Sequence, residues 1–166
     1  MSNNMVDSLL LIIDVQRGFI NDNTKHIPSK VTELQKKYGP VAATAFQNPG
    51  HSPFRTILNW NGFSPRSEET DLAYVLKPGA PLFWKSDYSG PTNKILRFLT
   101  ENGIKTVDIC GINTDVCVQY TALSLFQSGF RVRVIADACG STRGLEYHRA
   151  GLLCVSHGIG KDNIVV

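Results

Sequence analysis

The amino-acid sequence lacks several features that mark large classes of proteins. The apolar run at residues 9–13 is too short for a membrane span or a secretory signal, and no basic segment precedes it. We therefore expect no membrane partner and a cytoplasmic location. Neither sign of charge dominates, since 17 Lys and Arg residues stand against 14 Asp and Glu residues and the net charge of +3 forms no basic stripe. This distribution argues against a nucleic-acid partner.

Paired-cysteine and nucleotide-binding motifs are absent too. The four cysteines (Cys110, Cys117, Cys139 and Cys154) form no C-x-x-C pair, and we expect free thiols in a reducing compartment. The sequence contains no G-x-G-x-x-G, Walker A, G-x-S-x-G or H-E-x-x-H motif. These absences disfavour a dinucleotide site, a P-loop, and the common serine-hydrolase and zinc-protease sites.

What the chain does contain is a regular alternation of strand and helix patterns. Its 166 residues, 42% apolar and 19% charged, suit one globular domain, residues 1–166. We expect strands at 8–15, 41–46, 82–85, 104–110, 131–136 and 163–166, and helices at 28–37, 53–60, 91–102, 116–127 and 145–156. The predicted fold class is α/β, a single-domain three-layer α/β/α arrangement with a mostly parallel, Rossmann-like sheet of about six strands.

Three chemically capable side chains fall at the carboxyl ends of predicted strands. Asp14 ends the first strand, Lys85 ends the third, and Cys117 follows the fourth. Ligands of parallel α/β sheets bind beyond this edge, so the three should lie close together. Thr114 and Asp115 are suitable N-cap residues, which places Cys117 in the first turn of a helix, where a thiol tends towards thiolate. By position alone, a small buried residue filling this corner is the alternative interpretation.

Three segments resemble one enzyme superfamily. Residues 111–118 (Gly-Ile-Asn-Thr-Asp-Val-Cys-Val), followed by Thr121 and Ala122, are similar to the nucleophile signature of the isochorismatase-like cysteine hydrolases, the superfamily of nicotinamidases and N-carbamoylsarcosine amidases. Residues 12–19 resemble its D-x-Q-x-x-F segment, and residues 83–89 resemble its catalytic-lysine segment. The segments occur in the family's order, and the resemblance runs over nearly the whole chain.

The resemblance implies a catalytic triad and an oxyanion hole. Cys117 would be the nucleophile, Asp14 the general base and acid, and Lys85 the cation between them. It also implies a cis peptide bond between Ile112 and Asn113, with the backbone N–H groups of Asn113 and Cys117 as the oxyanion hole.

The chain departs from the family where nicotinamidases bind metal. Those enzymes carry Asp-x-His after the second strand, whereas residues 46–53 read Phe-Gln-Asn-Pro-Gly-His-Ser-Pro here. We therefore expect no metal site and no cofactor, with His51 as a loop residue or a substrate contact. Aromatic residues are more often plain core, but five residues are candidates for the pocket of a small flat substrate. These are Phe19, Asn48, Trp60, Trp84 and Tyr88.

Retention of Cys117 implies, through the resemblance, a cysteine amidohydrolase. It would cleave a C–N bond of a small amide, ureide or carbamoyl compound via an acyl-enzyme. Two alternatives stay open. True isochorismatases lack the nucleophilic cysteine and hydrolyse a vinyl ether with the aspartate, which would give the central role to Asp14. The chain would otherwise be a catalytically idle member that binds a metabolite or senses redox state.

The resemblance also implies homo-oligomers. The segment 53–60 gives a physical reason, because it gathers apolar side chains on one face. We expect a dimer or a tetramer in which Phe54, Trp60 and Arg55 contact a second subunit and wall the active site. The alternative is that this face packs on its own sheet.

Overall fold

The fold is one parallel sheet, described here for residues 8–88 and 93–166 of a computed structural model. Six strands lie in the order β3-β2-β1-β4-β5-β6, and all neighbours are parallel. They are β1 (Ser8–Ile13), β2 (Val41–Phe46), β3 (Leu82–Lys85), β4 (Thr106–Ile112), β5 (Arg131–Gly140) and β6 (Ile164–Val165). The predicted α/β class with a Rossmann-like sheet of about six strands is confirmed.

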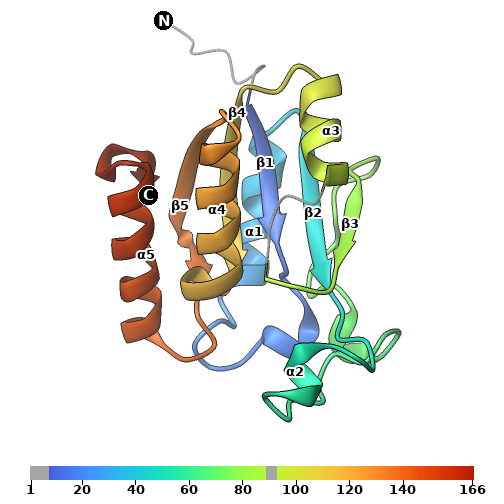
Figure 1. Ribbon diagram of the computed structural model, residues 1–166. Coiled ribbons are helices and arrows are strands. Elements are labelled where there is room, and N and C mark those ends of the chain that lie inside the picture. Colours follow the sequence, from blue (N-terminus) through green and yellow to red (C-terminus); the bar gives the residue numbers. More distant parts are fainter. Residues whose placement is uncertain (1–7, 89–92) are drawn as a thin grey trace, which may run out of the picture.

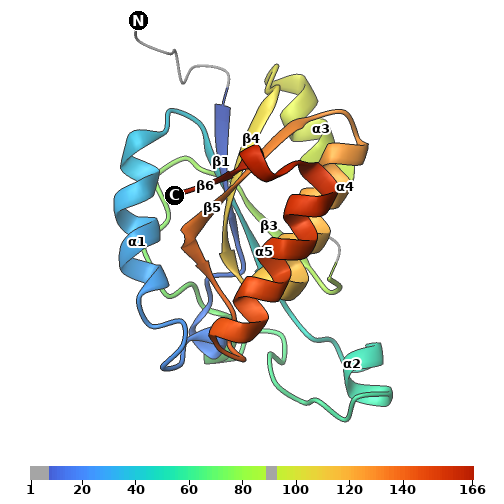
Figure 2. The same ribbon diagram turned by 90° about the vertical axis from the view of Figure 1, so that its left-hand side faces the viewer.

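Helices cover both faces of the sheet and make three layers (Figure 2). One face carries α1 (Ile27–Leu34), and the other carries α3 (Asn93–Glu101), α4 (Gln119–Gln127) and α5 (Leu145–Ile159). The central strands are buried on both faces, and their apolar side chains form the main core. In the described part of the chain, no helix is both long enough and apolar enough to cross a membrane.

The carboxyl ends of the strands meet at the lower edge of the sheet in Figure 1. Beyond this edge lies the first part of the β2–β3 connection, with the one-turn helix α2 (Pro53–Thr56). The predicted helix 53–60 is therefore too long. The chain turns back after α2, and the Trp60 N–H donates to the Phe54 carbonyl oxygen at 2.9 Å.

Other boundaries also differ from the prediction. β5 extends to Gly140, beyond its predicted end at residue 136, with a shift in its pairing to β4. The segment predicted as one helix after β4 begins with a π-helical turn, Thr114–Val118, and continues as α4. The first residues of the predicted helix 91–102 lie outside the described part of the chain.

Gly111 allows β4 to approach β1 closely near the carboxyl edge. Its φ is +129°, and it lies at the shift in pairing between β4 and β5. A Cβ at this position would lie 2.1 Å from the Ile13 carbonyl oxygen in β1. Only glycine fits such a contact, and the residues that follow the two strands are thereby brought side by side.

Replacing Gly111 by alanine is therefore expected to lower the free energy of unfolding by more than about 2 kcal/mol, or to prevent folding. Both the backbone angle and the facing backbone of β1 oppose the added Cβ. Urea unfolding measures the effect. Gly39→Ala is the control, because a Cβ there meets nothing within 4 Å. Equal unfolding midpoints for the two variants would contradict this packing.

Candidate active site

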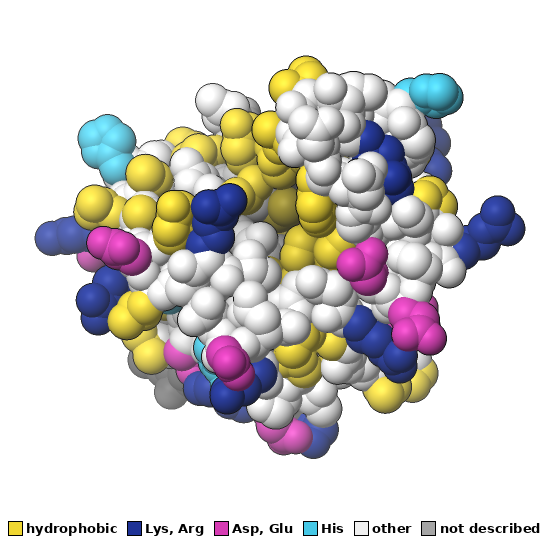
Figure 3. Space-filling model, turned by 90° about the horizontal axis from the view of Figure 1, so that it is seen from below, with side chains coloured by type: hydrophobic (Ala, Val, Ile, Leu, Met, Phe, Trp, Pro, Cys, Tyr) yellow, Lys and Arg dark blue, Asp and Glu magenta, His cyan; other side chains and the backbone are white. Residues whose placement is uncertain are grey.

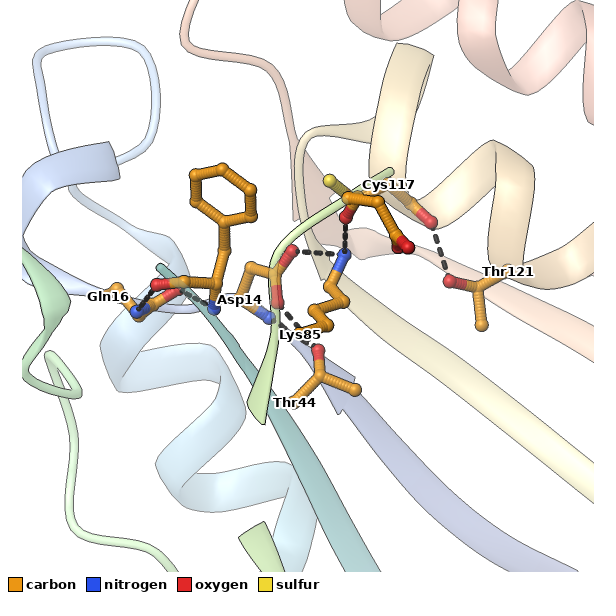
Figure 4. Close-up of polar contacts among 8 residues, drawn as sticks. Asp14, Gln16, Thr44, Lys85, Cys117 and Thr121 are labelled. Atoms are coloured by element: carbon orange, nitrogen blue, oxygen red, sulfur yellow. Dashed lines mark hydrogen bonds and ion pairs between the residues drawn. The ribbon is translucent and has the colours of Figure 1, made fainter. Parts of the chain in front are cut away.

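Asp14 follows β1 directly, and Thr44 in β2 orients its carboxylate (Figure 4). The Thr44 hydroxyl donates to Asp14 Oδ1 at 2.7 Å and accepts from the Asp14 N–H at 3.2 Å. The φ of Asp14 is +49°, a left-handed conformation that aspartate tolerates better than most residues. The Asp14 side chain is inaccessible to solvent, so these contacts fix its direction.

Lys85, the last residue of β3, forms an ion pair with Asp14 inside the protein. Its Nζ lies 2.8 Å from Asp14 Oδ2, and the two side chains are 1% and 0% exposed. Burial acts to lower the pKa of Lys85, but the negative charge of Asp14 outweighs it and raises the pKa above its ordinary value. The ammonium also donates to the Asp87 carbonyl oxygen at 3.4 Å. Lys85 is therefore a cation throughout the physiological pH range.

Cys117 completes this buried group from the turn before α4 (Figure 4). It is 6% exposed and lines a cavity. Burial and the neighbouring Asp14 raise the pKa of the Cys117 thiol to about 12, against an opposing effect of Lys85. The expectation of a resting thiolate is thus corrected. Burial and the Asp14 carboxylate raise the pKa of the thiol by more than the backbone N–H groups of the turn lower it. At neutral pH the sulfur of the free protein keeps its proton.

The turn after β4 is held by the segment that follows β5. The peptide bond between Ile112 and Asn113 is cis. The Thr142 N–H donates to Asn113 Oδ1 at 2.7 Å. The Thr114 hydroxyl lies 2.7 Å from His148 Nδ1 in α5. Burial lowers the pKa of His148, which favours the neutral form of its ring.

A cavity of about 570 Å³ opens over Cys117 at the carboxyl edge, and Figure 3 shows a hollow with apolar side chains on this face. The volume suits a small-molecule site. Six aromatic residues are among those that line it: Phe19, Phe46, Phe54, Trp60, Phe63 and Tyr88. The rings pack on one another, as in the stacked pair Phe19 and Phe63 with centroids 4.1 Å apart. Three of the five predicted pocket residues, Phe19, Trp60 and Tyr88, are among these walls.

The other two predicted pocket residues do not line the cavity. Trp84 is 49% exposed, because β3 is an edge strand and side-chain alternation turns Trp84 away from the side on which Lys85 is buried. Asn48 is fully buried, and its amide donates to the carbonyl oxygens of Trp60 and Gly62 at 2.9 Å each. It shapes the loop beneath the pocket wall and has no surface left for a substrate.

Two of the residues predicted to contact a second subunit make contacts within their own chain. Phe54 is 4% exposed and packs among aromatic rings of its own chain. The Arg55 guanidinium donates to the Asn48 carbonyl oxygen at 3.0 Å. The alternative of packing within the chain therefore holds for Phe54, whereas Ile57 and Leu58 are exposed. Assembly into a dimer or a tetramer stays a prediction.

Two supporting residues were not singled out from the sequence. Thr44 orients Asp14, and a signal for it existed, because Thr44 is the one polar residue of the strand Val-Ala-Ala-Thr-Ala-Phe. Gln16 joins three segments, since its Nε2 donates to the carbonyl oxygens of Phe46 and Thr70 at 2.8 and 2.9 Å. The Phe46 N–H donates in return to Gln16 Oε1. Its place in the segment that resembles D-x-Q-x-x-F was the available signal.

The described residues at the same edge form no cluster of metal ligands. Within residues 8–88 and 93–166, no group of three or more His, Cys, Asp or Glu side chains is arranged to hold a metal ion. His51 is exposed and does not line the cavity. Its neighbours in the loop supply no carboxylate two residues before it, so the residues present do not fit an Asp-x-His metal site.

Comparison with known proteins agrees with this architecture. A family model described as "Isochorismatase domain" matches residues 8–160. The probable hydrolase YcaC of Escherichia coli (strain K12) is 25% identical over 153 residues, which cover 87% of this chain and 67% of YcaC. Isochorismatase family protein 2A of Dictyostelium discoideum is 38% identical over 68 residues, which cover 40% of this chain and 34% of that protein.

A solved structure shows the same fold. The pyrazinamidase of Pyrococcus horikoshii, solved in complex with zinc, matches with a TM-score of 0.81 and 23% sequence identity over 96% of this chain and 97% of that one. The aligned segments of the two sequence relatives span about two thirds of YcaC and one third of the Dictyostelium protein. Because the family model covers nearly all of the described residues, the chain belongs to the isochorismatase-domain family of hydrolases.

Proposed function

We propose that the protein is a cysteine amidohydrolase that cleaves the C–N bond of a small amide, ureide or carbamoyl compound without a metal ion. The observation that carries this proposal is the buried group of Asp14, Lys85 and Cys117 beneath one aromatic-walled cavity. The likeness in fold to a pyrazinamidase supports an amide as the substrate. Retention of the cysteine supports amide cleavage over ether cleavage.

The first half-reaction forms an acyl-enzyme. Asp14 takes the proton of Cys117 as the sulfur attacks the substrate carbonyl carbon, so the C–S bond forms while the carbonyl electron pair moves to oxygen. The N–H groups of Asn113 and Cys117 stabilise this oxyanion. When it collapses, Asp14 gives the proton to the leaving nitrogen, the C–N bond breaks, and a thioester remains on Cys117.

Water completes the reaction. Asp14 accepts a proton from a water molecule as its oxygen attacks the thioester, and a second oxyanion occupies the same hole. Its collapse breaks the C–S bond, and the Cys117 sulfur regains a proton from Asp14. The balance is one amide and one water converted to one acid and one amine or ammonia.

Lys85 and Thr44 prepare the base for both steps. The ammonium at 2.8 Å and the hydroxyl at 2.7 Å hold the two carboxylate oxygens of Asp14 in place. Lys85 also lowers the cost of forming the Cys117 thiolate, the species that the surroundings otherwise disfavour. The nucleophile therefore forms as substrate is attacked and not in the free protein.

A screen of small amides, ureides and carbamoyl compounds for ammonia release tests the function. With a substrate in hand, Cys117→Ala should lower kcat by at least about a thousandfold, because the covalent nucleophile is gone. Cys154→Ala is the matched control, an exposed thiol on α5. Full turnover by Cys117→Ala would refute the acyl-enzyme and give the central role to Asp14. No turnover of any compound would favour the idle, metabolite-binding alternative.

The raised pKa of Cys117 predicts how the rate of its alkylation by iodoacetamide depends on pH. The measurement uses a Cys154→Ala background, which lacks the exposed thiol. Alkylation should rise only at alkaline pH, since the raised pKa keeps the thiol neutral below it. Asp14→Asn removes a negative neighbour and should shift the profile to lower pH, whereas Lys85→Met should shift it to higher pH. A profile of the Cys154→Ala protein with its midpoint below about 8.5, the value of a free thiol, would contradict this electrostatic account.

Chelation tests the proposed metal independence. Prolonged dialysis against EDTA and a zinc-selective chelator should leave kcat and KM unchanged, because the mechanism uses no Lewis acid. Metal analysis of the dialysed protein is the control that the treatment worked. Loss of activity that added zinc restores would overturn this part of the proposal.

A further inference from the structure

Thr114, three residues before Cys117, depends on one side chain of α5. Thr114 is inaccessible to solvent, and its hydroxyl lies 2.7 Å from His148 Nδ1. Among residues 8–88 and 93–166, this hydroxyl makes no other hydrogen bond. A buried hydroxyl without a partner destabilises the conformation that contains it. The position of Thr114 is therefore tied to the ring of His148.

The helix α5 also packs on the backbone of the same turn. It begins near the carboxyl edge of the sheet (Figure 1), and Gly151 lies three residues after His148 on the same helix face. A Cβ on Gly151 would lie 2.7 Å from the N and Cα atoms of Asp115, so the contact requires glycine. The hydrogen bond and this close contact together hold the turn against α5.

This turn carries the N–H groups proposed as the oxyanion hole. The N–H groups of Val116 and Val118 donate to the Asn113 carbonyl oxygen at 3.1 Å each, so the turn closes on Asn113. Thr114 lies within the closed turn, between the proposed donors Asn113 and Cys117. Stabilisation of an oxyanion depends steeply on where its donors point. A shift of Thr114 would therefore disturb the oxyanion hole.

His148 acts on this turn from outside the substrate cavity. It does not line the cavity over Cys117 but a separate cavity of about 370 Å³, which His26 also lines. Burial and the neighbouring His26 lower the pKa of His148, whereas Asp115 acts in the opposite direction. In a neutral ring with unprotonated Nδ1, the nitrogen accepts from the Thr114 hydroxyl and leaves no buried donor unpaired.

We propose that His148 is a positioning residue of the hydrolysis. Through Thr114 it holds the N–H groups of Asn113 and Cys117 in the geometry that stabilises the oxyanion, and it raises the rate of acyl transfer without contributing to substrate affinity. This inference rests on the proposed amidohydrolase function and assigns to it a residue outside the cavity. Because His148 contacts the turn and not the substrate, its effect should be similar for different substrates.

Two reactions of Cys117 separate this role from general support of the fold. p-Nitrophenyl acetate acetylates the thiol and releases p-nitrophenolate through a tetrahedral oxyanion, whereas iodoacetamide alkylates the sulfur by displacement of iodide without one. Both reactions are followed in a Cys154→Ala background, which lacks the exposed thiol. His148→Leu should lower the maximal rate of the nitrophenolate burst by about 10- to 100-fold. The half-saturating ester concentration and the alkylation rate should stay nearly the same.

Further variants test the path through Thr114. His148→Asn keeps an acceptor near the place of Nδ1 and should retain most of the burst rate. Thr114→Val removes only the hydroxyl and should match His148→Leu, and the double variant should be no slower than either single variant. His157→Leu is the matched control, because His157 is an exposed histidine of the same helix, and it should leave the burst unchanged.

Several results would overturn the proposal. One is an unchanged burst rate in folded His148→Leu, or in Thr114→Val if His148→Leu does not fold. Another is an equal loss of acylation and alkylation, which would reflect displacement of the whole site. A burst that Cys117→Ala abolishes but neither variant slows would keep the amidohydrolase and refute the role of His148. Absence of a burst from the Cys154→Ala protein, with Cys117 still alkylated, would refute the acyl-enzyme and this inference with it.

Discussion

The buried ion pair between Asp14 and Lys85 is the interaction on which the site depends. Removing two charged side chains from water costs several kcal/mol per ion, and their mutual attraction offsets this only in good geometry with the remaining positions hydrogen-bonded. The 2.8 Å contact, the Thr44 hydroxyl and the Asp87 carbonyl oxygen meet that condition. Any displacement of one strand end would leave a charge unpaired, so the carboxyl edge of the sheet is held in one arrangement.

The reactive residues and the residues that wall the substrate cavity lie on different parts of the fold. The base and the cation stand on strands β1 and β3, and the nucleophile stands on a turn that the β4 glycine places against β1. The walls of the cavity come largely from connections beyond the sheet, chiefly the β2–β3 segment, together with the β1–α1 segment and the residues before α5. Loops vary more easily than strands. The same buried group therefore suits different small substrates as its aromatic and charged walls change.

The sequence predicted the strands and helices well because the hydrophobic pattern and the Gly and Pro residues between elements are local signals. The strands 41–46 and 82–85 have the predicted bounds, and the rule for the carboxyl edge of a parallel sheet brought the three reactive residues together. The rest depended on tertiary context. Trp84 faces outwards because β3 is an edge strand, and Phe54 is buried because its loop folds back over the edge. The proton on Cys117 follows from burial, which no spacing of residues encodes.

A rapid-quench experiment tests the central claim, that Cys117 carries the acyl group of the substrate. Enzyme in excess is mixed with a compound that releases ammonia, quenched in acid at successive times, digested, and examined by mass spectrometry at the peptide that contains Cys117. The account predicts an adduct with the mass of the acyl group that rises and then decays as the acid product appears. Complete consumption of the substrate with the Cys117 peptide unmodified at every time point would contradict it.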